Sequence, residues 1–348
     1  MKEKQNSAPF VLNGRWQYRL RSLINLNWST FYITLRRLFK GARFPNWSWS
    51  LETSMHFLKT QTDIAFDMPN HADGREYQDS LLFKSSAIGR VNIETLQSPV
   101  KGHWYEPKSE KNEVTLLYLH GGGYTYYSKA HENIIALVTL AASSRTFAPD
   151  YRLTPEHPFP AQLEDALAAY RWLLDTGIVP EQLVIAGDSA GGNLTLTLLL
   201  AIRNAGLPFP AGAICIAPWT DLSNPGESMR TNDSHDWITE RMAKRWADWF
   251  CQGKDASNPL ISPVHADLKG LPPIYIQAGS AEILYDMICV FEKEAKKQGA
   301  DVTLDVWPNM IHDFQAFGDL VTESREALQR IGEMVVRFTS IKNKDIIN

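Results

Sequence analysis

The sequence has 348 residues, of which 44% are hydrophobic and 21% charged, as expected of a globular protein with a large core. Its formal net charge of −4 gives no reason to expect nucleic acid as a partner, because nucleic-acid-binding proteins present an excess of positive charge. The three cysteines are scattered and form no CxxC pattern, which argues against a zinc site and for free thiols. No signal-peptide pattern is recognisable, so we expect a cytoplasmic protein.

The first fifty residues contain nine basic residues and one acid. Between Arg21 and Arg36 lies an uncharged run of fourteen residues, which is shorter than the ~20 needed to cross a bilayer. Apolar residues recur there at helical steps, namely Ile24, Trp28, Phe31, Leu35 and Leu38. A basic amphipathic helix of this kind can lie on a membrane surface. We favour the alternative, a cap helix whose apolar stripe packs on the rest of the protein, because such stripes usually face protein.

The remaining chain predicts an α/β protein with a mainly parallel sheet covered by helices on both sides. Residues 1–80 are expected to be mainly helical, with a helix at 49–60 and a linker at 70–74. A strand at 91–96 precedes an antiparallel neighbour at 102–105. Strands at 114–119, 146–149, 183–186, 212–217, 274–278 and 302–306 then alternate with helices at 132–142, 161–174, 194–204, 284–298 and 323–339. This alternation requires right-handed crossovers, and residues 222–265, with a helix at 240–250, interrupt it.

A GxSxG motif lies between the strand at 183–186 and the leucine-rich helix that follows, in the run Gly187-Asp188-Ser189-Ala190-Gly191. Between a strand and a helix, this motif is typical of a nucleophile elbow. The glycines omit Cβ atoms that would collide in a tight turn, and the serine hydroxyl is held clear of the backbone. We therefore expect Ser189 to be a nucleophile. The alternative is an ordinary glycine-rich turn.

The run His120-Gly121-Gly122-Gly123-Tyr124 follows the strand at 114–119. Three consecutive glycines are costly in backbone entropy, but they let bare N–H groups approach a reacting oxygen closely. We expect Gly122, Gly123 and Ala190 to provide the N–H groups of an oxyanion hole. A phosphate-binding loop is the alternative, but its usual spacing is missing. His120 is expected to fix the loop by hydrogen bonding.

A serine nucleophile needs a base, and the base needs an acid that orients it. Of the nine histidines, His312 is the one that follows the last predicted strand, where the base is expected. Two carboxylates follow the strand at 274–278. Glu282 lies in the loop, which favours it as the orienting acid, whereas Asp286 lies one helical turn later and is expected to cap or pair within the helix.

Five motifs occur in a fixed order: HGGG at 120–123, DYRLTPEHPFPA at 150–161, GDSAGG at 187–192, EILYD at 282–286 and HDF at 312–314. Together they resemble the hormone-sensitive lipase family of carboxylesterases (bacterial family IV) in the α/β-hydrolase superfamily. In that family the acid loop usually reads D-P-L-x-D, and here Glu282 stands in place of the first aspartate. The usual H-G-F has become His312-Asp313-Phe314, which adds a carboxylate beside the base that the sequence alone does not explain.

The resemblance implies an α/β-hydrolase fold with a helical cap built from two parts of the chain. We expect residues 1–80 and the insertion 222–265 to form the cap, and residues 81–221 and 266–348 to form the catalytic core. It also implies catalysis with no cofactor. No metal site is expected either.

The resemblance implies hydrolysis of small-molecule carboxylic esters with short to medium acyl chains and bulky alcohol groups. The aromatic residues expected around the pocket favour hydrophobic esters, lactones included. Tyr124, Trp219, Trp28 and Phe31 are expected to line the substrate pocket. The alternatives are a formamidase or amidase that uses the same triad, and a ligand-binding receptor, in which the catalytic histidine is replaced. A homodimer is left open.

Overall fold

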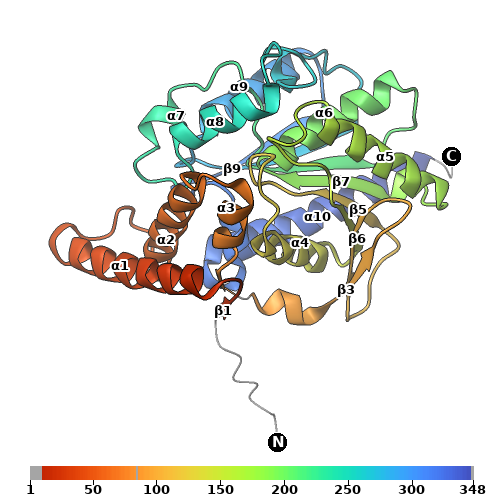
Figure 1. Cartoon of the computed structure of the whole chain (residues 1–348). Coiled ribbons are helices and arrows are strands. Elements are labelled where there is room, and N and C mark those ends of the chain that lie inside the picture. The colour runs from red at the N-terminus through yellow and green to blue at the C-terminus, as the bar shows by residue number, and fades with distance from the viewer. Residues whose placement is uncertain (1–9, 84, 346–348) are drawn as a thin grey trace, which may run out of the picture.

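An eight-stranded sheet forms the centre of the molecule in the computed structural model, which describes residues 10–83 and 85–345 (Figure 1). In spatial order its strands are β10 (Val302–Trp307), β9 (Ile274–Gly279), β8 (Gly212–Ile216), β7 (Leu183–Asp188), β5 (Thr115–Leu119), β6 (Arg145–Pro149), β4 (Gly102–Pro107) and β3 (Val91–Leu96). Strand β4 pairs antiparallel with β3 and β6, and the remaining pairs are parallel. The predicted α/β class is confirmed.

The central strands are apolar at nearly every position because both faces of the sheet are covered. Strands β5, β7, β8 and β9 are buried along their whole length. Alternate side chains enter two separate cores: Leu117 and Ile185 face one, and Leu116 and Val184 face the other. This burial on both faces explains why these strands are continuous hydrophobic runs rather than alternating ones.

Helices complete the two layers. On one face α4 (Lys129–Ala142) and α10 (Thr322–Asp345) pack together, and on the other face lie α5 (Ala161–Asp175), α6 (Ala190–Asn204) and α9 (Tyr285–Lys297). Short 3-10 turns connect several elements, namely η1 (Ser86–Arg90), η2 (Pro180–Gln182), η3 (Pro263–His265) and η4 (Phe314–Leu320). The core strands and helices therefore lie close to the predicted positions.

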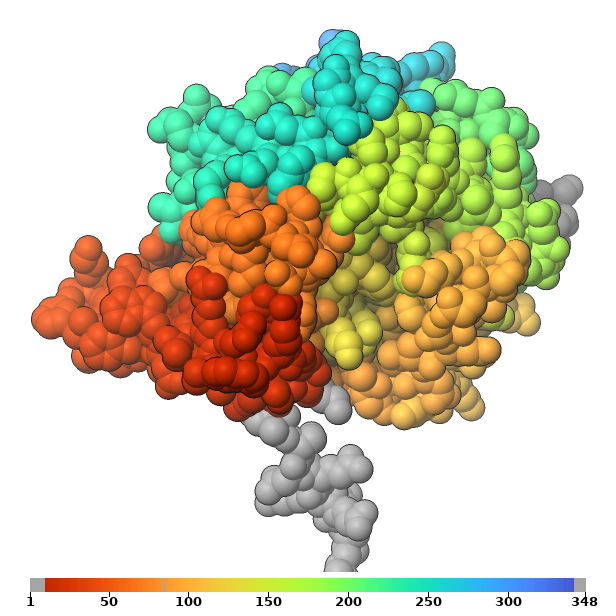
Figure 2. Space-filling model, in the orientation of Figure 1, coloured from red at the N-terminus to blue at the C-terminus, as the bar shows by residue number. Residues whose placement is uncertain are grey.

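Two remote parts of the chain lie together beside the carboxyl ends of the parallel strands (Figures 1 and 2). The N-terminal part contains α1 (Trp16–Lys40), α2 (Trp49–Phe66), α3 (His71–Gln78) and a small sheet of β1 (Phe10–Leu12) and β2 (Leu81–Phe83). The insertion contributes α7 (Ser228–Thr231) and α8 (Glu240–Cys251). Arg241 of α8 forms ion pairs with Asp63 and Asp67 on α2, and Phe66 packs against Trp249. These contacts agree with a two-part cap, whose exact boundaries stay a prediction.

Two predictions for the N-terminal part are wrong. The predicted linker at 70–74 belongs to helix α3, which Asn70 caps through its side chain; a Cβ on Gly74 would collide with the carbonyl of Ala65, so glycine lets α3 approach α2 closely. The predicted stripe of α1 does not pack on the catalytic core. Helix α1 contacts α2, α3 and β2 instead, and the stripe faces solvent. The strands β1 and β2 were not predicted either.

Candidate active site

Ser189 lies in a sharp turn between β7 and α6, with φ 54° and ψ −119°. A left-handed φ is strained for a residue with a Cβ, and the surrounding contacts hold it in place. The Ser189 N–H donates to the carbonyl of Ile216 at 2.8 Å. A Cβ on Gly187 would collide with the carbonyl of Gly191, and one on Gly191 with the carbonyl of Leu119. The turn thus needs glycine on both sides of the serine.

Glu282 and His312 follow two adjacent strands, β9 and β10, and the structure brings their side chains together. Glu282 Oε1 lies 3.8 Å from His312 Nδ1, and both side chains are completely buried. The other oxygen of Glu282, Oε2, accepts a hydrogen bond from the Gly279 N–H at 2.8 Å. The carboxylate is therefore oriented by its own loop and points its free oxygen at the imidazole.

Asp286 has a different set of partners. Its Oδ2 accepts a hydrogen bond from the N–H of Ser228 at 2.7 Å, and so ties the first turn of α9 to α7 in the insertion. Of the two candidate acids, the structure therefore brings Glu282, and not Asp286, to the histidine.

A second carboxylate contacts His312 on its other side. Asp313 Oδ2 lies 3.2 Å from His312 Nε2, and Asp313 adopts a left-handed φ of 53°. Burial disfavours a charged imidazole, but the carboxylates of Asp313 and Glu282 outweigh burial and hold the pKa of His312 well above its ordinary value. The imidazole thus lies between two carboxylates, one at each nitrogen.

Asp188, next to the serine, is also a buried carboxylate. Burial, together with the nearby Asp313, raises the pKa of Asp188 to about 6. The hydroxyl of Tyr118 donates to Asp188 Oδ1 at 2.7 Å, and a Cβ on Gly121 would collide with its Oδ2. Asp188 therefore fixes the start of the glycine loop against the nucleophile turn.

The glycine loop runs beside this turn with three successive residues at positive φ, Gly122 at 92°, Gly123 at 59° and Tyr124 at 61°. The Gly122 carbonyl accepts the N–H groups of Thr125 and Tyr126, which closes the loop as a tight turn. Trp246 from α8 packs on Gly123 so closely that no Cβ would fit there. Helix α8 of the insertion is thus in direct contact with the loop.

His120, at the start of the glycine loop, lies among other aromatic rings. Its ring is buried between the rings of Tyr127 and Tyr151, each with its centroid 4.1 Å away. Its Nδ1 lies 2.8 Å from the carbonyl of Gly121. Burial holds the pKa of His120 well below its ordinary value, so the ring is neutral and acts as a packing and hydrogen-bonding element.

Asp236, in the insertion, was not identified from the sequence, yet it contacts both catalytic loops. The side chain is completely buried. Its Oδ2 accepts the N–H of Ile283 at 2.9 Å, and its Oδ1 accepts the N–H groups of Trp237 at 2.7 Å and His312 at 3.3 Å. The indole N–H of Trp237 in turn donates to the His312 carbonyl at 2.8 Å. No sequence motif surrounds Asp236, so its contact with both loops becomes apparent only from its buried position in the structure.

The four residues predicted to line the pocket separate into two pairs. Trp219 is buried beside the nucleophile, and its backbone N–H donates a hydrogen bond to the Ser189 carbonyl at 3.1 Å. Tyr124 is also buried; its hydroxyl donates to Asn193 at 2.6 Å and its ring stacks on Phe250. Trp28 and Phe31 are 57% and 58% exposed on the outer face of α1, so the structure does not bring them to Ser189. For these two the prediction is wrong.

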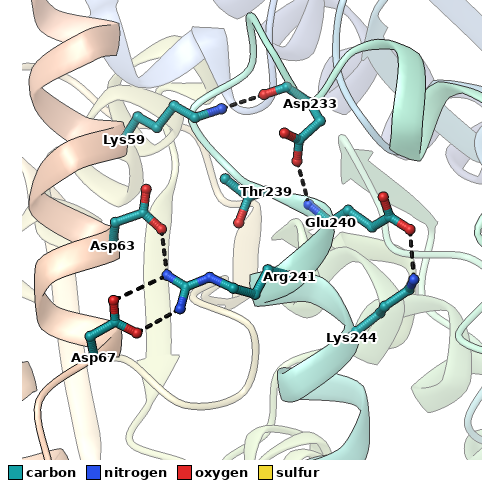
Figure 3. Close-up of a pocket in the computed structure, with 8 residues that line it drawn as sticks. All are labelled: Lys59, Asp63, Asp67, Asp233, Thr239, Glu240, Arg241 and Lys244. Atoms are coloured by element: carbon teal, nitrogen blue, oxygen red, sulfur yellow. Dashed lines mark hydrogen bonds and ion pairs between the residues drawn. The ribbon is translucent and has the colours of Figure 1, made fainter.

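A polar groove of about 870 Å³ lies between α2 and α8 (Figure 3). Its lining is charged on both sides and comprises Lys59, Asp63, Asp67, Asp233, Thr239, Glu240, Arg241 and Lys244. Most of these charges are already paired: Arg241 with both aspartates of α2, and Lys244 with Glu240. The groove includes none of the predicted catalytic residues. Nor does any group of three or more metal-ligating side chains occur among the described residues.

The sequence pattern of a family described as alpha/beta hydrolase fold matches residues 116–316. An acetyl-hydrolase from Streptomyces hygroscopicus is 40% identical over 252 residues, which cover 71% of this chain and 84% of the relative. A crystal structure of an esterase from the bacterial hormone-sensitive lipase family is 33% identical, with a TM-score of 0.71 over 91% of this chain and 98% of that one. This chain belongs to the hormone-sensitive lipase family of carboxylesterases. The assignment makes it a serine ester hydrolase.

Two further relatives agree with this assignment. A carboxylesterase from Mycobacterium tuberculosis is 30% identical over 244 residues, which cover 67% of this chain and 76% of the relative. The crystal structure of EstE5 soaked with p-nitrophenyl butyrate is 32% identical, with a TM-score of 0.72 over 91% of this chain and 99% of that one.

Proposed function

We propose that this family member hydrolyses carboxylic esters through an acyl-enzyme on Ser189, with His312 as the base and Glu282 as the orienting acid. The observation that carries the proposal is the combination of a strained Ser189 with a fully buried Glu282–His312 pair. A serine in an elbow and an imidazole oriented by a carboxylate are the elements that acyl transfer requires.

In the first half of the reaction the Ser189 hydroxyl attacks the ester carbonyl while His312 Nε2 takes its proton. The negative oxygen of the tetrahedral intermediate is bound by the N–H groups of Gly122, Gly123 and Ala190. The left-handed φ values of the two glycines and the start of α6 at Ala190 support this role, because all three N–H groups belong to tight turns around the serine.

The intermediate collapses as His312 returns its proton to the alcohol oxygen, which leaves as the alcohol. Water then attacks the acyl-enzyme with His312 again as base, and the acid product departs from a regenerated Ser189. Both steps require an unprotonated Nε2 at the start. The Asp313 carboxylate, 3.2 Å from this nitrogen, therefore favours the form of His312 that cannot start the reaction.

The substrates we propose are esters with short to medium acyl chains. The relatives support this choice, since one is named an acetyl-hydrolase and another was soaked with p-nitrophenyl butyrate. The buried aromatic residues Tyr124 and Trp219 near the nucleophile support hydrophobic substrates, bulky alcohols and lactones among them. No observation favours a formamide or amide substrate, and the presence of His312 argues against a receptor without catalysis.

The test is Ser189→Ala, assayed with p-nitrophenyl acetate and p-nitrophenyl butyrate. We expect loss of turnover by about 10⁶-fold without loss of fold, since the triad acts as a unit. Ser223→Ala is the matched control, because Ser223 lies beside His265 and Asp221 but outside an elbow. An organophosphate should label Ser189 stoichiometrically; labelling at another serine, or equal loss in both variants, would contradict the assignment.

Two further expectations go beyond the comparisons and stay proposals. The cytoplasmic location rests on the free cysteines Cys215, Cys251 and Cys289, which are typical of a reducing compartment. The second proposal is a homodimer, which a measurement of the molar mass in solution would test.

A further inference from the structure

Helix α1 exposes a continuous apolar face along its 25 residues. The side chains on this face are between 41% and 81% exposed, and they are Trp16, Leu20, Ile24, Trp28, Phe31, Tyr32, Leu35, Leu38 and Phe39. They recur at three- and four-residue steps and therefore share one side of the helix. Helix α1 forms the projecting edge of the molecule, shown in red in Figure 2. A contiguous apolar face of this length marks an interaction site.

The opposite face of α1 is buried and mostly polar, which is the reverse of an ordinary surface helix; Ile33 is its one buried apolar side chain. Three of its side chains, Ser22, Asn25 and Ser29, are at most 7% exposed. Ser22 bonds to Ser80 at 2.6 Å, and Asn25 contacts Gln61 on α2 at 3.2 Å. These buried hydrogen bonds determine the rotation of the helix about its axis, because turning the apolar face inward would leave the buried polar groups of α2 without partners.

The charges on and around this face have one sign. Helix α1 contains five basic residues and no acid. Arg36 and Arg37 both pair with the buried Glu52 of α2. The other three, Arg19, Arg21 and Lys40, are exposed cations, and the Arg21 guanidinium lies over the Tyr77 ring. Two copies of the chain docked through this face would bring cations together with no acid on either helix. An anionic surface, by contrast, complements the face in both hydrophobicity and charge.

Residues 1–9 have a composition that is poor in apolar side chains. Residues 1–9 read MKEKQNSAP and offer Met1 as their single large apolar side chain, with two further lysines. They lie outside the described residues, and their composition adds positive charge rather than apolar surface. Among the residues that the structure describes, no helix is long and apolar enough to span a bilayer. The face therefore suits a helix lying in the plane of a membrane surface.

We propose that α1 docks this enzyme onto an anionic lipid membrane. The apolar face enters the boundary between headgroups and acyl chains, with its tryptophans at the polar level that indole rings prefer. Arg19 and Lys40 contact the anionic headgroups. The proposal does not depend on the identity of the catalytic residues, since α1 packs mainly on α2, α3 and β2.

The test is co-sedimentation of the full-length protein with vesicles of phosphatidylcholine alone and of phosphatidylcholine with 30% phosphatidylglycerol. We expect binding to the anionic vesicles that weakens as salt is raised from 0.05 to 0.5 M. The variant Ile24→Gln/Leu38→Gln/Phe39→Gln should bind at least tenfold more weakly, because these exposed side chains supply apolar area. Glutamine retains helix propensity, so circular dichroism should be unchanged.

The matched control is Val290→Gln/Leu320→Gln/Val336→Gln, which removes three exposed apolar side chains from other elements and should bind vesicles like the unchanged protein. A charge variant, Arg19→Gln/Lys40→Gln, should reduce the salt dependence. The proposal is overturned if the protein does not bind anionic vesicles, if it binds neutral vesicles equally well, or if the α1 variant and the control bind alike. A dimer in solution that the α1 variant makes monomeric would show that a second copy covers the face.

Discussion

At the scale of single residues, His312 differs from a simple triad histidine in that each of its ring nitrogens faces a carboxylate. Glu282 lies on the Nδ1 side and Asp313 on the Nε2 side. The first can orient the ring for catalysis, whereas the second competes with Ser189 for the nitrogen that must accept a proton. Asp313 thus favours the protonated form of the imidazole. Its effect can be measured through the pH dependence of hydrolysis.

Replacing Asp313 by asparagine should move the acid limb of the kcat/KM profile to lower pH by about one unit or more. The reason is electrostatic: carboxylates hold the pKa of His312 above its ordinary value against the effect of burial, and removing one lowers it, so more base is neutral at a given pH. The measurement is the pH dependence of p-nitrophenyl acetate hydrolysis. Asp319→Asn, an exposed position in the same segment, is the control. If the acid limb of Asp313→Asn lies at the same pH as that of the unchanged protein, Asp313 does not affect the pKa of His312.

Replacing either of the two candidate acids by its amide should have opposite effects on turnover. Glu282→Gln should lower kcat by about 10⁴-fold, because a neutral amide no longer stabilises the imidazolium or its tautomer. Asp286→Asn should keep near-normal turnover, since asparagine can still accept the N–H of Ser228. Steady-state kinetics of both variants decides between them. Should Asp286→Asn be the more damaging in a folded protein, the assignment of Glu282 would be wrong.

At the scale of elements, the segment between α7 and α8 connects the cap to the catalytic loops. Asp236 joins the loop after β9 to the loop after β10 through Ile283 and His312. On the other side, Lys59 of α2 donates to the carbonyl of Asp236 at 3.1 Å. Burial raises the pKa of Asp236 to about 6, while the nearby His312 opposes this shift. Asp236 is therefore a positioning residue supplied by the insertion.

Replacing Asp236 by asparagine should lower kcat by about 10²-fold with a smaller change in KM, because misplacing a catalytic group by about 1 Å has an effect of that size. The carboxylate accepts N–H groups with both oxygens, and an amide has only one acceptor. Asp233→Asn is the matched control: Asp233 lies in the same segment and accepts the Glu240 N–H, a role that asparagine retains. Urea unfolding separates the effect on kcat from loss of stability. Equal kinetics in the two variants would contradict a positioning role.

At the scale of the whole molecule, the proposed catalytic residues are almost inaccessible to solvent. Ser189 is 6% exposed, and Glu282 and His312 are not exposed at all. Helix α8 provides the contact above the glycine loop through Trp246, whose indole fills the space next to Gly123. The two parts of the predicted cap are held together by contacts between α2 and α8, among them the pairing of Arg241 with Asp63 and Asp67. Packing at α8 therefore affects both stability and the shape of the site.

Replacing Trp246 by alanine should reduce the free energy of unfolding by about 3–5 kcal/mol, the usual cost of deleting a large buried aromatic side chain. The variant should also change the ratio of rates on p-nitrophenyl acetate and p-nitrophenyl octanoate, because the cavity adjoins the glycine loop. Trp249→Ala, on the side of α8 that contacts Phe66 and His71, is the control and should leave this ratio unchanged. An altered ratio in both variants would place the selectivity elsewhere.

The sequence by itself determined the α/β fold and its family, because the relevant signals are local. Strands buried on both faces are continuous apolar runs, and helices are amphipathic with a fixed period, so their order can be read along the chain. The GxSxG and triple-glycine runs are also local signals, because these glycines stand where the turn leaves no space for a Cβ atom. The position of Ser189 in a strained turn could therefore be predicted.

What only the tertiary structure decided depends on how remote segments face one another. The stripe of α1 predicted a buried face, but periodicity shows only that the apolar residues share one side and not which side is buried. The hydrogen bonds of Ser22 and Asn25 with partners far along the chain decide that the polar side faces inward. Asp236 is similar: its role comes from backbone N–H groups 47 and 76 residues away, and such pairings leave no local pattern in the sequence.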